Sequence, residues 1–233
     1  MSVGLLCVLL LLVPASVAGA GGRAVSLSST DGTSLLADIY EAPARPAPGI
    51  VLVHMLSRNR GDWDRFANGL QDAGFTALAI DLRGHGGSSG SAQRLPDMVQ
   101  DVRAAVQWLS TRPGVRPGSI ALVGASLGAN LALLAAVDLP AVRALALLSP
   151  SLDYRGLRAD TALVKRIGAR PIWMAAGTTD PLSLRTLKEL ATETSGPREQ
   201  RIVEGPAHGT QLLAASPDIN SALVDWLRRT LLS

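Results

Sequence analysis

The sequence predicts an α/β domain in which helices cover both faces of a mostly parallel sheet. Short apolar runs alternate along the chain with segments of helical periodicity, as in a parallel sheet with helical crossovers. A length of 233 residues fits one such domain, and a hydrophobic content of 47% is enough for a substantial core. Several polar residues follow directly after apolar runs, where parallel strands end and where such sheets bind their ligands.

The apolar runs are the expected strands. Asp31-Gly32 is a hairpin signal between the first two, and residues 49–54 (GIVLVH) are typical of a strand buried on both faces. Pro43, Pro46 and Pro48 precede this run as a stiff connector, because proline continues neither a helix nor a central strand. The expected strands are residues 24–28, 35–40, 49–54, 76–81, 120–123, 144–149, 171–176 and 200–204.

Segments with helical periodicity separate most of these strands. Residues 63–73 stop at Gly74, and Pro96 stands near the start of an amphipathic helix that ends at Ser110. An Ala/Leu-rich helix follows Gly128. The remaining expected helices are residues 183–193 and the closing segment 222–232.

Residues 1–20 are expected to be a signal peptide, although no Lys or Arg precedes its apolar run. That run, residues 5–13, is too short to span a bilayer, and the small residues that follow it end in Ala18-Gly19-Ala20, which resembles a cleavage site. We therefore expect an exported protein, periplasmic or extracellular, whose domain is residues 21–233. The alternative is an uncleaved N-terminal helix that anchors the chain. Cys7, the only cysteine, would leave with the signal peptide.

Charge and composition limit the classes of partner that we expect. The formal charge is +3, and the arginines are scattered rather than clustered, so we expect no nucleic-acid partner. No cluster of histidine and acidic residues has metal-ligand spacing, and we expect neither a metal nor another cofactor. The expected partner is a small ester molecule, and membrane contact would come only through an uncleaved leader.

The pattern Gly124-Ala125-Ser126-Leu127-Gly128 stands between an apolar strand and the Ala/Leu-rich helix. This is G-x-S-x-G in the strand–turn–helix context in which the serine acts as a nucleophile. Such a sharp turn strains the serine backbone, and the flanking glycines leave room for it. Free N–H groups at the start of the helix favour negative charge. We predict that Ser126 is the nucleophile; the alternative is a glycine-rich turn whose serine only caps the helix.

A serine nucleophile needs a base and a third group that orients the base. Of the three histidines, His208 lies in a turn-rich loop after the last strand and is the predicted base. His54, at the end of an interior strand, is expected to fix the loop that follows it. Asp180, directly before a proline at a strand end, is the predicted acid, with an Asx-type turn as its alternative role. Asp153, after the preceding strand, is its rival.

Acyl transfer also needs hydrogen-bond donors for the oxyanion. We predict the backbone N–H groups of Leu127, directly after the nucleophile, and of Met55, in the loop after the third strand. Leu56, Tyr154 and Leu182 are predicted to line a pocket for a modest apolar group.

These residues together resemble the α/β-hydrolase superfamily over nearly all of the chain from residue 24. The resemblance implies a sheet of eight strands with the second antiparallel, and a triad of Ser126, Asp180 and His208. It implies a structural role for residues 83–88. In length the chain is most similar to the small dienelactone-hydrolase or carboxylesterase-like members, of which dienelactone hydrolases proper use a cysteine nucleophile. The segments that carry the resemblance are residues 52–54 (LVH), 81–88 (DLRGHGGS), 124–128, 177–181 and His208.

Many members of that superfamily insert a cap domain between the strands expected here at residues 144–149 and 171–176. This chain has room there for one short helix at most, so we expect an open site. The predicted function is a serine hydrolase that cleaves carboxylic esters of small to medium apolar groups through an acyl-enzyme. A serine peptidase or a thioesterase would use the same triad. An alternative of another class is an exported binding or scaffold protein that keeps the fold without turnover.

Overall fold

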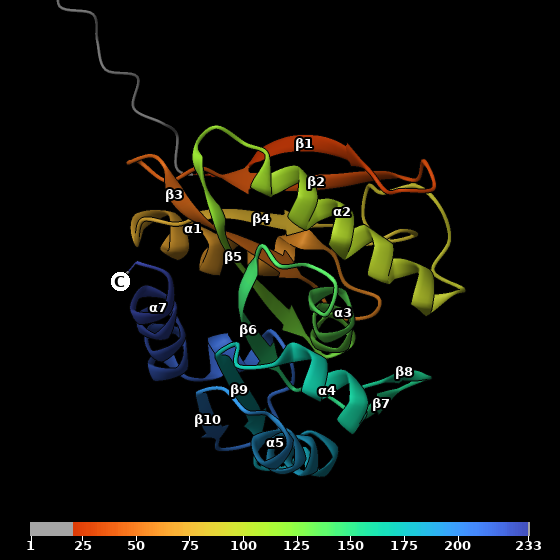
Figure 1. Ribbon diagram of the computed structural model, residues 1–233, viewed down its shortest axis with the longest axis vertical. Helices are drawn as coiled ribbons and strands as arrows, with labels where there is room; N and C mark the ends of the chain where they lie inside the picture. Colours follow the sequence, from red (N-terminus) through yellow and green to blue (C-terminus); the bar gives the residue numbers. More distant parts are fainter. Residues whose placement is uncertain (1–20, 233) are drawn as a thin grey trace, which may run out of the picture.

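Eight strands form one sheet in the computed structural model, which describes residues 21–232 (Figure 1). The order across the sheet is β1-β2-β4-β3-β5-β6-β9-β10. β2 runs antiparallel to both of its neighbours, and every other neighbouring pair is parallel, which confirms the predicted architecture. The strands are β1 (Arg23–Ser28), β2 (Ser34–Tyr40), β3 (Ala47–Val53), β4 (Thr76–Ile80), β5 (Val115–Ala125), β6 (Val142–Leu148), β9 (Ile172–Gly177) and β10 (Arg198–Val203).

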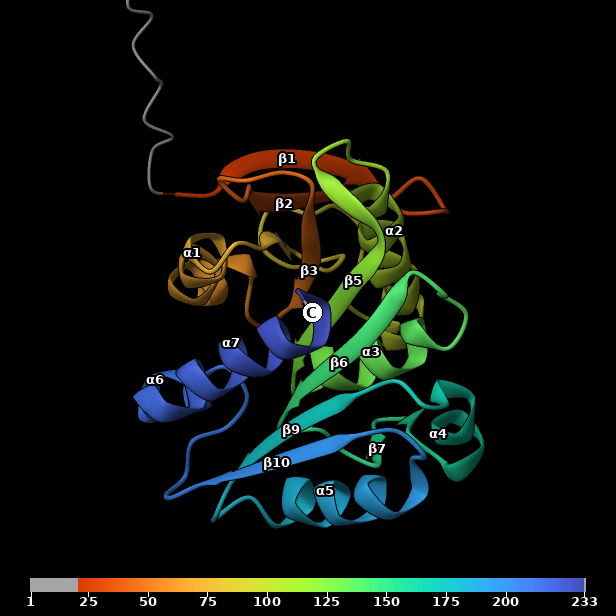
Figure 2. The same ribbon diagram turned by 60° about the vertical axis from the view of Figure 1, so that its left-hand side comes forward.

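Helices cover both faces of this sheet (Figure 2). One face packs against α1, α6 and α7, and the other packs against α2, α3, α4 and α5. Two short 3-10 helices, η1 (Arg60–Trp63) and η2 (Leu95–Asp97), precede α1 and α2. The α-helices are α1 (Asp64–Asp72), α2 (Met98–Ser110), α3 (Leu127–Ala136), α4 (Thr161–Ile167), α5 (Pro181–Glu193), α6 (Gln211–Ala215) and α7 (Pro217–Leu231).

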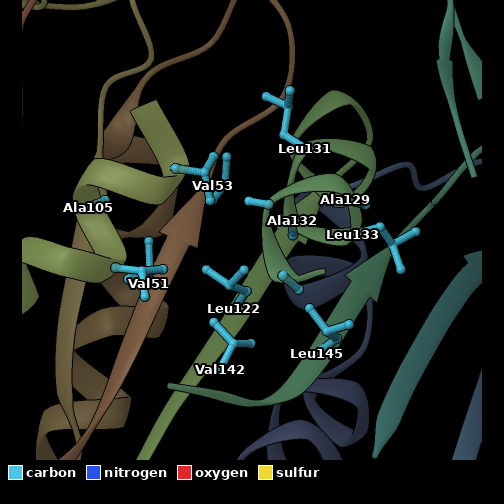
Figure 3. Packing of buried hydrophobic residues seen from close by; sticks show 14 of the residues in the cluster. Val51, Val53, Ala105, Leu122, Ala129, Leu131, Ala132, Leu133, Val142 and Leu145 are labelled. Carbon is cyan, nitrogen blue, oxygen red and sulfur yellow. The ribbon is translucent and has the colours of Figure 1, made fainter. Parts of the chain in front are cut away.

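The sequence of the central strand β3 is apolar because both faces of the strand are covered. Val51 and Val53 belong to the core beneath α2 and α3, whereas Ile50 and Leu52 belong to the core beneath α1 and α7. Successive side chains of a strand point to opposite faces, so a strand covered on both sides needs apolar residues at every position. Figure 3 shows Val51 beside Leu122 of β5, with Val53 and the small residue Ala132 of α3 above them.

Pro48 lies inside β3, which corrects the expectation that the prolines stay outside the central strands. Ala47 pairs with Val115 of β5 and Gly49 pairs with Ile120, so the register shifts across the proline. Pro48 has no N–H to donate to the ladder, and the irregularity occurs at this residue. β5 begins at Val115 rather than at residue 120.

The connection between β6 and β9 contains more than the single short helix that we expected. A hairpin of two-residue strands, β7 (Asp153–Tyr154) and β8 (Leu157–Arg158), precedes α4 there. The connection is still too short for a cap domain. Near the C-terminus, α6 was not expected, and α7 begins at Pro217 rather than at residue 222 because proline suits the first turn of a helix.

The predicted signal peptide, residues 1–20, lies outside the described residues, so that interpretation stays a prediction. Among residues 21–232, no helix combines the length and the apolar character that crossing a membrane requires.

Replacement of Gly128 by alanine should prevent normal packing of α3 on the sheet. A Cβ at this residue would overlap the carbonyl oxygen of Val53 in β3, and backbone atoms of a central strand cannot move aside cheaply. We expect Gly128→Ala to lower the free energy of unfolding by about 2 kcal/mol or more, measured by urea denaturation. Gly69→Ala is the matched control, because Gly69 is exposed within α1 and a Cβ there meets no atom within 4 Å. The control should gain roughly 0.5–1 kcal/mol, and equal effects of the two changes would contradict the packing argument.

Candidate active site

Ser126 stands at the sharp turn from β5 into α3. Its φ of 50° and ψ of −115° are unfavourable for a residue with a side chain. Its N–H donates to the carbonyl oxygen of Leu148 at 2.8 Å, which ties the turn to β6. A Cβ at Gly124 would overlap the carbonyl oxygen of Gly128, so the turn can close only with glycine at this position. The serine hydroxyl is therefore held above the carboxyl edge of the sheet by its backbone.

His208 meets Ser126 from the loop that follows β10. Its Nε2 lies 2.8 Å from the Ser126 Oγ, and its Nδ1 lies 2.7 Å from Oδ2 of Asp180. Because an ionised carboxylate only accepts hydrogen bonds, Nδ1 carries the hydrogen and Nε2 is left to accept from the serine hydroxyl. This is the geometry of a nucleophile, a base and an orienting acid.

Asp180 is the N-cap of α5, and its two carboxylate oxygens have different partners. Oδ1 accepts from the N–H of Ser183 at 3.1 Å, while Oδ2 faces His208. Burial acts to raise the pKa of Asp180, but the hydrogen bonds from Ser183 and His208 outweigh it and hold the pKa below its usual value. The Asp180 carboxylate therefore both caps the turn into α5 and bonds to His208, so it combines the two roles that the sequence offers as alternatives.

Asp153, the rival acid, takes part in the β7–β8 hairpin instead. Its Oδ1 accepts from the N–H of Gly156 at 2.6 Å, and its Oδ2 accepts from Nε of Arg158 at 2.9 Å. The side chain is exposed. The structure therefore brings Asp180, and not Asp153, to the histidine.

His54 and His85 join the loop after β3 to the loop after β4. His54 donates from Nδ1 to the carbonyl oxygen of Met55 at 2.6 Å and accepts at Nε2 from the N–H of Leu82 at 3.0 Å. His85 accepts at Nε2 from the N–H of Ser57 at 3.2 Å. A ring nitrogen that accepts from a backbone N–H carries no hydrogen, so both rings are neutral. Burial of His54 lowers its pKa to about 4.

Arg83 ties the loop after β4 to α2 and to the turn between β1 and β2. Its guanidinium donates to Asp101 of α2 at 2.7 Å, and Asp101 is fully buried. It also donates to Asp31, in the turn between β1 and β2, at 2.7 Å. The segment that begins at Arg83 therefore holds the loop in place, in keeping with the structural role that the resemblance implied.

Two residues that hold loops around the candidate site were not identified from the sequence. The buried Asn130, in the first turn of α3, donates to the carbonyl oxygens of Ser151 at 2.7 Å and Leu157 at 2.9 Å, and accepts from the N–H of Ser151 at 3.0 Å. The buried Ser149 accepts from the N–H of Gly209, next to the catalytic candidate His208, at 2.9 Å. A polar residue inside the otherwise apolar helix was the signal that could have identified Asn130.

The remaining candidate residues lie in different surroundings. Leu127 is the first residue of α3, where N–H groups have no acceptor within the helix. Leu56 lines a groove and packs partly against the core. Tyr154, on the hairpin, also packs partly against the core, whereas Leu182 is 72% exposed at the start of α5. Within residues 21–232, no group of three or more His, Cys, Asp or Glu side chains could hold a metal ion.

The sequence model of the family described as serine aminopeptidase, S33, matches residues 44–175, which is more than half of the chain. The chain belongs to this family of α/β hydrolases. The matched segment contains Ser126 and ends before Asp180 and His208. The pairing of these two residues with the serine therefore rests on the geometry alone.

Relatives of this S33 family member are similar to it over different shares of its length. An uncharacterised protein of Mycobacterium tuberculosis is 29% identical over 205 residues, which cover 80% of this chain and 72% of that protein. The monoglyceride lipase homolog of monkeypox virus is 32% identical over 107 residues, 45% of this chain and 39% of the viral protein. Among solved structures, the Pyrococcus furiosus esterase Pf2001 has a TM-score of 0.77 at 17% identity, covering 90% of this chain and 91% of that one. At this identity the last similarity shows the fold alone.

The neutral, buried His54 should make this hydrolase less stable in acid. The unfolded chain binds a proton at His54 near pH 6.5, but the folded protein does so only near pH 4, so stability is lost as the pH falls between these values. The loss is roughly 3 kcal/mol when complete. We expect His54→Asn, which keeps a donor for the Met55 carbonyl, to be less stable at pH 7 but to lose less on acidification. Urea denaturation from pH 7.5 to 4 measures this; identical acid losses in the two proteins would refute it.

Proposed function

We propose that the chain is a serine hydrolase that cleaves carboxylic esters of small to medium apolar acyl or alcohol groups. The observation that carries the proposal is the hydrogen-bonded series from the Ser126 Oγ through His208 to the Asp180 carboxylate. Membership of a hydrolase family and the esterase fold of a structural neighbour support it.

In the proposed reaction, His208 Nε2 takes the proton of the Ser126 hydroxyl as Oγ attacks the ester carbonyl carbon. The protonated ring then gives this proton to the departing alkoxide, and an acyl-enzyme remains. Water attacks the acyl group by the same route, with His208 again as the base, and releases the acid. Asp180 fixes the ring tautomer and stabilises the imidazolium as it forms.

The negative charge that develops on the carbonyl oxygen of the substrate needs hydrogen-bond donors beside the serine. We propose the N–H of Leu127, at the start of α3, and an N–H of the loop that begins at Met55. In this loop the Met55 carbonyl oxygen accepts from His54 Nδ1 at 2.6 Å and from the N–H of Arg58 at 3.2 Å. Since the N–H of Leu56 belongs to the same planar peptide, these contacts also orient that N–H. Leu56 therefore stands beside Met55 as a second candidate donor.

The description of the family as serine aminopeptidases favours a peptidase as the second candidate function. A peptidase would use the same nucleophile and base, with an amine in place of the alkoxide as leaving group. Comparison of p-nitrophenyl butyrate with aminoacyl p-nitroanilides would separate the two activities. A larger kcat/KM for the anilides would favour the peptidase.

Removal of the proposed nucleophile should abolish turnover without unfolding the protein. We expect Ser126→Ala to lower kcat for p-nitrophenyl butyrate by roughly 10⁴-fold, because no acyl-enzyme can form. The measurement is initial-rate kinetics with circular dichroism as the check on folding. A fluorophosphonate probe should label the wild-type protein and not the variant; an unlabelled wild-type protein would favour the scaffold alternative.

A matched pair of variants tests which of the two aspartates acts as the acid. Asp180→Asn should lower kcat by roughly 10⁴-fold or somewhat less, because an amide no longer selects the required tautomer of His208. Asp153→Asn should leave kcat within about twofold, since its carboxylate bonds only within the hairpin. Initial rates with p-nitrophenyl butyrate test both, and the reverse order of effects would refute the assignment of the acid.

A further inference from the structure

A groove of about 530 Å³ is lined by residues from three separate segments. Leu56 comes from the loop after β3, and Arg155 comes from the tip of the β7–β8 hairpin. The third segment runs up to the start of α2, and in Figure 1 this part of the chain and the hairpin project on the same side of the molecule. Its members in the lining are Ala92, Gln93, Arg94, Leu95 and Pro96.

Two of these segments are fixed directly to the surroundings of Ser126. Leu56 follows Met55, whose side chain lies against Gly209, the neighbour of His208. Asn130 in the first turn of α3 holds the hairpin through one hydrogen bond to Leu157 in β8 and two to Ser151, just before β7. A molecule seated in the groove would therefore extend away from the serine between the loop and the hairpin.

The lining combines an apolar floor with positive charge and contains no acidic residue. The apolar part comes from the leucine, alanine and proline side chains, and the charge comes from Arg94 and Arg155. Within the described chain, Arg155 makes no ion pair, and its φ of 51° places it in a tight turn that presents it outward. Arg94 is 81% exposed, and its one carboxylate neighbour, Asp97, is 3.6 Å away.

A different cavity shows that this charge pattern is not general on the molecule. The cavity between the hairpin, α4 and α5 is lined by four acidic residues, which are Asp153, Asp160, Glu189 and Glu193, and by one arginine. One other groove, which contains Arg143 and Arg170, also has guanidinium groups and no acid in its lining, but these residues lie at the starts of β6 and β9, at the opposite edge of the sheet from Ser126. Guanidinium groups bind carboxylate and phosphate through paired N–H donors.

We propose that the groove binds the distal anionic group of the substrate, so that the enzyme prefers esters whose acyl chain ends in a carboxylate or a phosphate. This rests on the proposed function, because the groove selects which ester Ser126 attacks. The acyl chain lies on the apolar floor and its anion lies between Arg94 and Arg155. The anion takes no part in the chemical steps, and its contacts act on kcat/KM through binding.

The test compares p-nitrophenyl hydrogen suberate, which carries a terminal carboxylate, with its methyl-capped diester, in which that carboxylate is an uncharged methyl ester. For the wild-type protein, kcat/KM should be at least about tenfold higher for the carboxylate ester, and the ratio should fall with added salt. In the double variant Arg94→Gln/Arg155→Gln the ratio should fall to about 1. Arg65→Gln, which removes an exposed arginine from α1 on the opposite face of the sheet, should keep the wild-type ratio.

A wild-type ratio of 1 or below, with Ser126-dependent release of p-nitrophenol from the capped ester, would overturn the anion site and leave the esterase proposal standing. Absence of any turnover and of fluorophosphonate labelling would overturn the esterase proposal. Calorimetric titration of Ser126→Ala with monomethyl suberate then decides on the groove. Binding that is weakened at least about tenfold by the two arginine substitutions supports the site, and no binding overturns it.

Discussion

The close approach of α3 to the central strands is the constraint on which this structure depends. Gly128 lies against the carbonyl oxygen of Val53, and Gly124 lies against the carbonyl oxygen of Gly128, with no room for a Cβ at either residue. Ser126 between them adopts a positive φ, at a cost of roughly 1–3 kcal/mol. The central strand β3 and the first two turns of α3 are buried, so the strain is offset by packing in two cores and cannot relax by moving the helix away.

Loops at the carboxyl edge are held around this turn by buried hydrogen bonds rather than by a cap domain. Ser149 holds the loop of His208, Asn130 holds the β7–β8 hairpin, and His54 with His85 holds the loop after β3. Each of these side chains is at most 9% exposed. Groups fixed in this way need little reorganisation when charge develops in a reaction, which is the requirement for electrostatic stabilisation.

Much of the fold could be predicted because its signals are local. A continuous apolar run marks a strand buried on both faces, and the turn at Ser126 requires glycines at fixed positions, so both are legible in the sequence. The choice of Asp180 over Asp153 was predictable from the rigid turn before Pro181. Pro48 was misjudged, because its tolerance depends on a register shift against β5 that only the sheet pairing reveals. The hairpin strands are two residues long and have no periodicity to detect, so the arginine at their tip gave no signal either.

No cap domain covers the site within residues 21–232, and this has an electrostatic consequence. The side chain of His208 is 44% exposed although Ser126 is only 7% exposed, so water reaches the proposed base while the proposed nucleophile is nearly covered. Charges at such an open rim interact through a high dielectric and are screened by salt. A single arginine there would therefore discriminate weakly between substrates, whereas two arginines from separate segments of one groove, together with the apolar side chains of its lining, can bind one anion together. Selectivity at this edge would thus come from where the β7–β8 hairpin is held, and Asn130, buried beneath it, is the residue that fixes that position.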